Sequence, residues 1–145
     1  AWLVKNKLEK NQRLAEKIEV EAGWENSIEM ALGAYLQAVC IESIDSLSSN
    51  LSSLIQGELV IIEDSSCSQD IKHEQGLPES LFHKVKGKNL NSHLQALLQN
   101  VYAVESLNAA MLLRGKLKTG QSLITKDGLW LGSDWLRIAS NKDTD

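Results

Sequence analysis

An internal repeat constrains the fold of this chain more than any other feature of its sequence. Residues 32–39 match residues 94–101 at an offset of 62, and one inserted residue then shifts the offset to 63. The matching positions keep their order over more than thirty residues, which indicates two copies of one structural unit. Matched pairs include Leu32 with Leu94, Gln37 with Gln99, Val39 with Val101, Gly57 with Gly120 and Ile61 with Ile124.

Each copy carries the same succession of periodicities: a helix, a strand, a second helix and a second strand. Apolar residues at helical spacing, followed by short β-favouring runs, produce this pattern in both copies. In the first copy it predicts helices over 24–35 and 44–55 and strands over 38–41 and 58–62. In the second copy it predicts helices over 90–98 and 107–113 and strands over 101–104 and 122–125.

Turn and linker signals complete the predicted organisation. Residues 64–78 are rich in Ser, Gly and acidic residues, contain the single proline and predict a long loop or linker. Asp127-Gly128 favours a two-residue turn onto a strand over 129–131, and a last strand is predicted over 136–139. We therefore predict an α/β (α+β) fold of two pseudo-symmetric halves with small sheets. The predicted boundaries are a single domain over 1–145, subdomain one over about 18–64, a linker over about 65–80 and subdomain two over about 81–140.

The sequence carries no motif for nucleotide hydrolysis or covalent catalysis. Neither Gly-x-x-x-x-Gly-Lys-Ser/Thr nor Gly-x-Gly-x-x-Gly occurs, and Ser133 lacks the Gly-x-Ser-x-Gly frame of a nucleophile elbow. His73, His83 and His93 recur at ten-residue intervals, which is wider than the usual spacing of paired zinc ligands. We expect no catalytic residue, no metal site, no cofactor and no small-molecule substrate.

Charge is unevenly distributed along the chain. The 15 basic and 19 acidic residues give a net charge of -4, which excludes a polycation held to nucleic acid by bulk charge. The net charge is +3 over 1–17, -11 over 18–80 and +4 over 81–145. Basic residues of the N-terminus and the second half are therefore candidates for DNA phosphate contacts, although solvated surface charge explains them equally well. The candidates are Lys5, Lys7, Lys10, Arg13, Lys84, Lys86, Lys88, Arg114, Lys116 and Lys118.

Apolar runs and cysteines bear on the compartment of the protein. The longest apolar run, residues 31–36, is far shorter than the about 20 residues that span a bilayer, so we expect no membrane segment. The chain begins without an initiator Met or a signal-peptide pattern, and we expect a piece of a longer protein. Cys40 lies in an apolar run and Cys67 in a Ser-rich stretch, and one core thiol with one exposed thiol suits a reducing cytoplasm.

Tryptophan is unusually frequent, with four tryptophans against one phenylalanine. Trp24 begins a predicted helix, and we expect it in the core. Trp130 and Trp135 flank Gly132 near strands that no later predicted element covers. These two tryptophans favour either an assembly surface or an ordinary core.

Three segments of the chain resemble a known family. They are VEAGWENSIEMALGAYLQAV at 20–39, VYAV at 101–104 and LITKDG at 123–128. Together they resemble the hinge domain of the SMC proteins, in particular that of bacterial chromosome-partition SMC proteins, over nearly the whole chain. The resemblance implies two α/β halves, in agreement with the repeat, and a homodimer of two such chains. It also implies coiled-coil arms and ATPase heads outside this sequence, a role in chromosome organisation and segregation, and a cytoplasmic, nucleoid-associated location.

The resemblance also implies where the functional surfaces lie. Many family members carry paired glycines at the dimer contact after the position of Asp127-Gly128, where this chain has Asp134-Trp135. Exposed strands at the ends of two oppositely charged halves favour pairing between the first half of one chain and the second half of the other. The predicted interface comprises Leu59, Val60, Ile61, Ile62, Gly128, Trp130, Gly132 and Trp135. Family hinges bind DNA near the coiled-coil junction, which implies weak, non-specific binding in which the N-terminal basic residues lie nearest.

A different class of function remains as an alternative. A small-molecule-binding α/β regulatory module without catalysis would have a ligand pocket at the carboxyl ends of its strands. A third class, an enzyme fragment, has no candidate catalytic group in this sequence. The position of any pocket and the mass in solution distinguish the first two classes.

Overall fold

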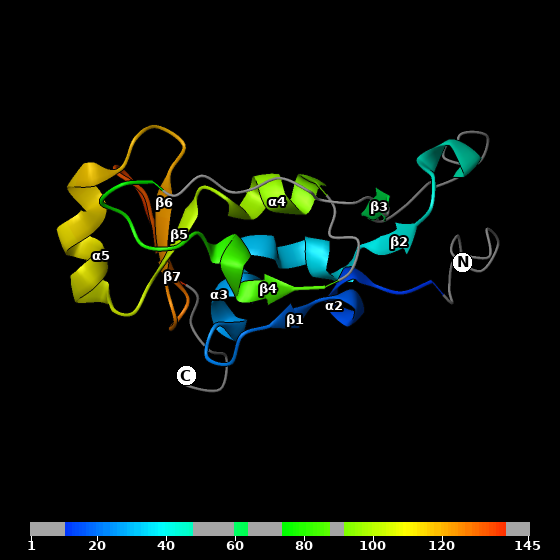
Figure 1. The fold of residues 1–145 in the computed structure, drawn as a ribbon, viewed down its shortest axis with the longest axis horizontal. Helices are drawn as coiled ribbons and strands as arrows, with labels where there is room; N and C mark the ends of the chain where they lie inside the picture. Colours follow the sequence, from blue (N-terminus) through cyan, green and yellow to red (C-terminus); the bar gives the residue numbers. More distant parts are fainter. Residues whose placement is uncertain (1–10, 48–59, 64–73, 88–91, 139–145) are drawn as a thin grey trace.

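The computed structural model describes residues 11–47, 60–63, 74–87 and 92–138. The molecule is elongated (Figure 1). A four-stranded sheet covered by one helix forms one end, and a two-stranded parallel sheet lies towards the other. The predicted α+β fold with small sheets is confirmed.

The first half follows the predicted order of elements with shorter helices. Its elements are α2 (Leu14–Lys17), β1 (Glu19–Val20), α3 (Glu25–Leu32), the 3-10 helix η1 (Gly33–Gln37), β2 (Val39–Ile41), the 3-10 helix η2 (Ile44–Leu47) and β3 (Ile61–Glu63). Helix α3 buries Ile28 and Leu32, which lie one turn apart. It ends at Gly33, where φ is +52° and the backbone N–H donates to the Glu29 carbonyl. The predicted helix over 24–35 therefore continues beyond residue 32 only as a 3-10 turn.

The second half matches the prediction more closely. Its elements are η4 (Leu81–Lys84), β4 (Val85–Lys86), α4 (Ser92–Leu98), β5 (Val101–Val104), α5 (Leu107–Leu113), η5 (Arg114–Lys116), β6 (Ser122–Thr125), β7 (Leu129–Leu131) and β8 (Leu136–Ile138). Helix α5 begins after Ser106, whose Oγ accepts a hydrogen bond from the Ala109 N–H at 3.2 Å. Gly128 closes the turn between β6 and β7 with φ +84°, a conformation that glycine adopts without steric cost.

The two copies share their topology but not their register. β2 pairs with β3, and β5 with β6, in parallel. Val39 lies opposite Ile61, so the sequence repeat would set Val101 opposite Ile124, whereas Val101 lies opposite Ser122. A shift of two residues keeps every side chain on its own face of the sheet, so the repeat tolerates it. β7 and β8 then extend the second sheet antiparallel, giving the order β5-β6-β7-β8.

The described elements α2, β1, η4 and β4 have no counterpart in the sequence prediction. β1 and β4 form a two-stranded antiparallel sheet in which Glu19 lies opposite Lys86, and the four-residue α2 precedes it. The predicted strand over 58–62 is wrong in its bounds, because β3 spans Ile61–Glu63. Of the predicted helix over 44–55, the described part is η2; residues 48–55 and Cys67 lie outside the described residues.

One hydrophobic core includes residues of both halves. It contains Trp24, Ile28 and Leu32 from around α3 together with Leu94 and Leu98 from α4, and all five are nearly inaccessible to solvent. Cys40 is also buried there, as its apolar context predicted.

The four-stranded sheet separates this core from a smaller one. Along β5, Val101 and Ala103 point into the shared core, while Tyr102 and Val104 point towards α5. Ala110 of α5, which is fully buried, packs in the smaller core with Tyr102 and Val104. Strands β5 and β6, whose residues are all buried, are therefore covered on both faces (Figure 1).

Polar contacts join the start of α3 to the turn between β6 and β7. The fully buried Ser27 donates its Oγ hydrogen to the Thr125 carbonyl at 2.6 Å. Two ammonium groups lie over the ring of Trp24, with Lys84 Nζ at 5.1 Å and Lys126 Nζ at 5.3 Å from its centroid. These contacts fix the first half against the sheet of the second.

Candidate functional site

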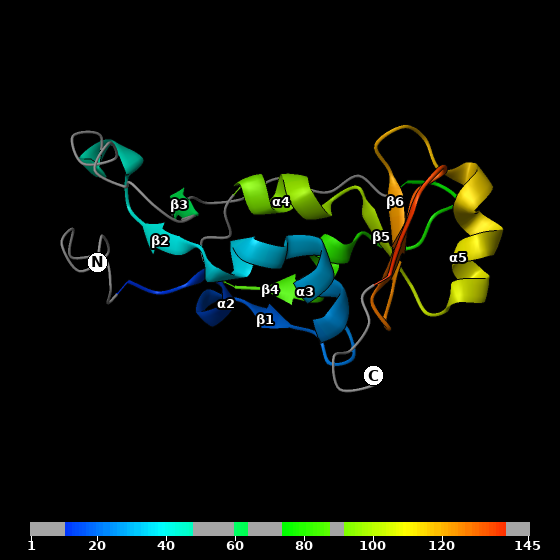
Figure 2. The ribbon, with the colours of Figure 1, turned by 180° about the vertical axis from the view of Figure 1, so that it is seen from behind.

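One strand edge of the four-stranded sheet is open in the described part of the chain. The outer edge of β5 is covered, because Ser80 forms a bridge with Tyr102 and the Ala103 N–H donates to the Glu79 carbonyl at 2.9 Å. β8 lies at the opposite edge, and within the described ranges it pairs only with β7. Seen from behind, the orange and red strands of β7 and β8 lie in front of β6 (Figure 2).

The two-stranded sheet of the first half has the same arrangement. The segment before α2 covers the outer edge of β2: the Leu14 N–H donates to the Ala38 carbonyl, and the Cys40 N–H to the Gln12 carbonyl, both at 2.9 Å. β3 pairs with β2 and with no other strand among residues that the structure describes. Among the described residues, each half therefore has one covered strand edge and one strand edge that no other described strand pairs with.

The open edge at β8 carries exposed apolar side chains. Leu136 is 57% exposed, Ile138 66% and the preceding Trp135 44%. Large apolar groups exposed side by side at a sheet edge mark a surface suited to a protein partner. The strand was predicted from the sequence, but Leu136 and Ile138 are not among the predicted interface residues, because the pattern of a three-residue strand does not reveal how much of it is covered.

The loop between β7 and β8 is closed by Trp135. The Gly132 N–H donates to the Trp135 carbonyl at 3.0 Å, and a Cβ at Gly132 would overlap the Trp135 indole. Trp135 packs edge-on against Trp130, with ring centroids 5.4 Å apart. Trp130 is half-buried and donates its Nε1 hydrogen to Ser122 Oγ at 2.8 Å.

The described residues of the predicted interface lie in three places in the structure. Gly132 and Trp135 lie beside the open edge of β8, and Val60, Ile61 and Ile62 lie at or just before β3. Gly128 lies at the other end of β7 from Gly132, where it faces Asn26 of α3 rather than the β8 edge. Trp130 is tied to Ser122 and Trp135, and Leu59 lies outside the described residues.

Lys84 is held by neighbouring carboxylates. Its side chain is 15% exposed and its Nζ lies 3.2 Å from Glu21 and 3.5 Å from Glu79, besides the Trp24 ring. Burial lowers the pKa of Lys84, but the hydrogen bond and negative charge of Glu21, together with Glu79, outweigh burial and raise the pKa above its ordinary value. Its charge is therefore largely neutralised within the fold.

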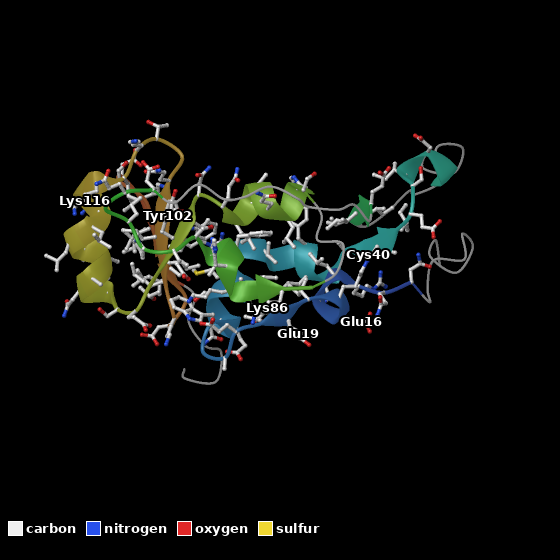
Figure 3. The ribbon with its side chains drawn as sticks, in the orientation of Figure 1. Glu16, Glu19, Cys40, Lys86, Tyr102 and Lys116 are labelled. Carbon is white, nitrogen blue, oxygen red and sulfur yellow. The ribbon has the colours of Figure 1, made fainter. Side chains whose placement is uncertain are left out.

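The other basic candidates that the structure describes do not form one continuous patch. Lys86 lies on β4 next to Glu19, whereas Lys116 lies at the α5 end of the molecule (Figure 3). Lys118 is paired with Glu74 at 2.8 Å, and this hydrogen bond and charge raise its pKa. Arg13 is half-buried before α2, and Arg114 binds the Ser133 carbonyl. Lys5, Lys7, Lys10 and Lys88 lie outside the described residues.

A shallow groove of about 370 Å³ lies between the end of α4 and the loop before β8. Its lining includes Val101 and Ser122, the first residues of the parallel strands β5 and β6, together with Trp130 and Trp135. The groove thus lies at the amino ends of these strands, opposite to the position that the small-molecule alternative predicts. In the described part of the chain, no three His, Cys, Asp or Glu side chains gather as metal ligands, and no helix is long and apolar enough to cross a membrane.

Comparisons with known proteins agree on one family. The model of the SMC proteins Flexible Hinge Domain matches residues 9–114. The chain is 31% identical over 142 residues to a chromosome partition protein Smc of Coxiella burnetii, covering 98% of this chain and 12% of that protein. It is 32% identical over 139 residues to the Smc protein of Xanthomonas oryzae, covering 96% of this chain and 11% of that protein. The chain thus spans about an eighth of the length of these relatives.

Solved structures are similar in fold. An asymmetric dimer of the Geobacillus stearothermophilus SMC hinge domain matches with a TM-score of 0.67 and 18% identity, covering 89% of this chain and 58% of that one. The Pyrococcus furiosus Smc hinge domain with an extended coiled coil matches with a TM-score of 0.65 and 15% identity, covering 96% of this chain and 56% of that one. Identities this low establish likeness of fold alone.

Proposed function

Because the chain belongs to the SMC flexible hinge domain family, we propose that it is the homodimerisation hinge of a longer chromosome-partition SMC protein. In this proposal the chain is not an enzyme. Coiled-coil arms and ATPase heads lie on sequence outside it, and the whole protein organises and segregates chromosomes in the cytoplasm, at the nucleoid. The hinge dimer named for the Geobacillus relative supports the proposed assembly.

The observation that carries the proposal is the strand edge in each half that no other described strand pairs with. A two-fold dimer that pairs β3 of one chain with β8 of the other satisfies both open edges of both chains. Pairing β3 with β3 or β8 with β8 would leave one edge of each chain exposed. A closed dimer therefore requires the first half of one chain to meet the second half of its partner.

The side chains on these two strands are compatible with such pairing. Ile62 of β3 points into the shared core, so Ile61 faces the opposite side. On β8, Arg137 lies 5.9 Å from the Trp130 ring on the core side, so Leu136 and Ile138 face the other side. A ladder that aligns these faces sets Ile61 beside Leu136 and Ile138.

Charge favours the same arrangement. The net charge is -11 over residues 18–80 and +4 over residues 81–145, so contact between unlike halves is attractive and contact between like halves is repulsive. This charge attraction makes the pairing between unlike halves more specific, but it supplies only a small part of the binding affinity.

Cysteine cross-linking tests the proposed pairing. In a Cys67→Ser background, Ile61→Cys and Ile138→Cys in one chain should give a covalent dimer with a short bis-maleimide, while each single variant should not. The matched control combines Ile61→Cys with Leu112→Cys. Leu112 is 82% exposed and lies on α5, not on the edge strand β8. A double variant that cross-links no better than this control would contradict the β3–β8 pairing.

We further propose weak, non-specific DNA binding through the N-terminal basic residues and the basic residues of the second half. Lys116 supports this proposal, because its side chain is exposed and it lies two residues from Arg114 and two from Lys118 in the sequence. Lys84 contributes least, since two carboxylates hold its ammonium. Phosphate contacts release counterions, so the affinity should fall steeply with salt.

Fluorescence anisotropy with labelled duplex DNA tests this second proposal. We compare wild type, a variant with Lys5, Lys7, Lys10 and Arg13 changed to Glu, and Lys116→Glu. Both variants should weaken binding and reduce the salt slope, whereas Lys84→Met should change neither. Absence of wild-type binding at about 20 mM salt, where the Debye length is roughly 20 Å, would contradict DNA binding by this domain.

A further inference from the structure

Arg114 has a geometry that phosphate binding does not explain. It follows α5 and reaches across to the loop between β7 and β8, where Nε and Nη2 donate to the Ser133 carbonyl at 3.3 and 3.1 Å. Ser133 and Asp134 form the turn that the Gly132 N–H closes onto the Trp135 carbonyl. The guanidinium therefore binds the outside of the turn that leads directly into β8.

The turn and β8 have few other supports. All three residues of β8 are exposed, and in the described part of the chain the strand has hydrogen-bonded neighbours only on the β7 side. Helix α5 packs on the sheet through the fully buried Ala110 and the partly buried Ala109 and Leu113. Arg114 thus connects a helix that packs on the sheet to the strand β8, all of whose residues are exposed.

We propose that Arg114 is a positioning residue that holds the Ser133–Asp134 turn, and with it Trp135 and β8, in the geometry that the partner chain binds. The proposal rests on the proposed dimerisation. A strand that is already ordered loses less conformational entropy when the partner binds, so the entropic cost of association is smaller. Loss of the Arg114 contact should therefore weaken the dimer without unfolding the chain. Arg114 would act through the turn and not through its own contact with the partner.

Sedimentation equilibrium tests the proposal with Arg114→Ala, Arg114→Lys and Lys116→Ala. Lys116→Ala is the matched control, because Lys116 lies in the same 3-10 turn as Arg114 and the substitution also removes one positive charge. We expect Arg114→Ala to raise the dimer Kd roughly fivefold, and Lys116→Ala to leave it within twofold. Arg114→Lys, which keeps the charge but loses the two-donor planar group, should lie between them.

Two further readouts separate positioning from direct charge contact. The Kd ratio between Arg114→Ala and wild type should not change with salt, because the acceptor is a neutral carbonyl. Backbone amides of β8 should exchange hydrogen faster in Arg114→Ala, with no change in the amides of β5. Equal Kd values for Arg114→Ala and wild type, equal weakening by Lys116→Ala, or a Kd ratio that disappears in high salt would each overturn the proposal.

The hydrogen-exchange result also separates this proposal from the proposed function. A monomeric wild type would contradict dimerisation by itself. Faster exchange in β8 of Arg114→Ala would still support the hold of Arg114 on the turn, and unchanged exchange would overturn it.

Discussion

At the scale of single residues, Ser27 is the most completely buried polar contact between the halves. Its Oγ donates to the Thr125 carbonyl at 2.6 Å, and the residue is inaccessible to solvent. Ser27→Ala should lower the free energy of unfolding by about 1 kcal/mol, because the net value of a buried hydrogen bond is of this size. Urea unfolding at fixed protein concentration measures it. Exposed Ser133→Ala is the control, and an equal effect of the two changes would contradict the assigned role.

Lys84 predicts a dependence of stability on alkaline pH. Its pKa is raised in the folded state, so its ion pairs stabilise the fold fully below the ordinary value of 10.5 and lose this effect as the pH rises through the folded-state pKa. The difference in unfolding free energy between wild type and Lys84→Met should therefore be constant from pH 7 to about 10 and shrink at higher pH. A difference that grows above pH 10.5 would contradict the ion pairing.

Gly132 and Trp135 predict a packing defect at the open edge. A Cβ at Gly132 would overlap the indole of Trp135, so Gly132→Val should displace that ring, and Trp135→Ala removes it. Each change should weaken the dimer by about 2 kcal/mol, or roughly 30-fold in Kd, as loss of an aromatic anchor does. Sedimentation equilibrium measures both variants; unchanged dissociation constants would exclude Trp135 from the interface.

At the scale of elements, β8 is the strand on which the proposed assembly depends. Ile138→Lys adds a charge where the partner strand would pair, and because Ile138 is 66% exposed the fold itself should tolerate the change. We expect the dimer Kd to rise at least about tenfold with little change in monomer stability. Leu112→Lys, on the exposed face of α5, is the control. Equal weakening by both lysines would indicate a general charge effect.

The sequence predicted those elements whose side-chain periodicity is long enough to read. α5 and the strands β5 and β6 have the predicted bounds, since buried apolar residues or a capping Ser106 define them. β1 and β4 were missed because two-residue strands show no alternation of side chains. Their paired residues are also far apart in the sequence, as Val20 and Val85 show. Helix α3 ends early at Gly33, whose positive φ the spacing of apolar residues did not reveal.

The candidate site was less accessible to sequence reasoning than the fold. The sequence identified its glycines and tryptophans as candidates. Only the folded structure shows that Gly128 faces Asn26 while Gly132 lies by β8. Lys84 looked like a free surface charge because Glu21, its partner at 3.2 Å, is 63 residues away. Whether a strand edge is open depends on which of its backbone groups have hydrogen-bond partners. The pattern of side chains along the sequence does not reveal these partners.

At the scale of the whole molecule, the described part of the chain combines a shared core with two strand edges, at β3 and β8, that lack a described partner strand. Core residues from both halves and the contacts around Trp24 join the halves. The edges of β3 and β8 lie in different sheets of the elongated molecule (Figure 1). In the proposed dimer, a second copy of the chain pairs with both of these edges.

The mass of the chain in solution tests the central claim most directly. Light scattering at tens of micromolar protein should give twice the chain mass of 16.0 kDa, and Ile138→Lys should shift the result towards the single mass. A wild-type mass of 16.0 kDa at that concentration would contradict the account of this chain as a homodimerisation hinge.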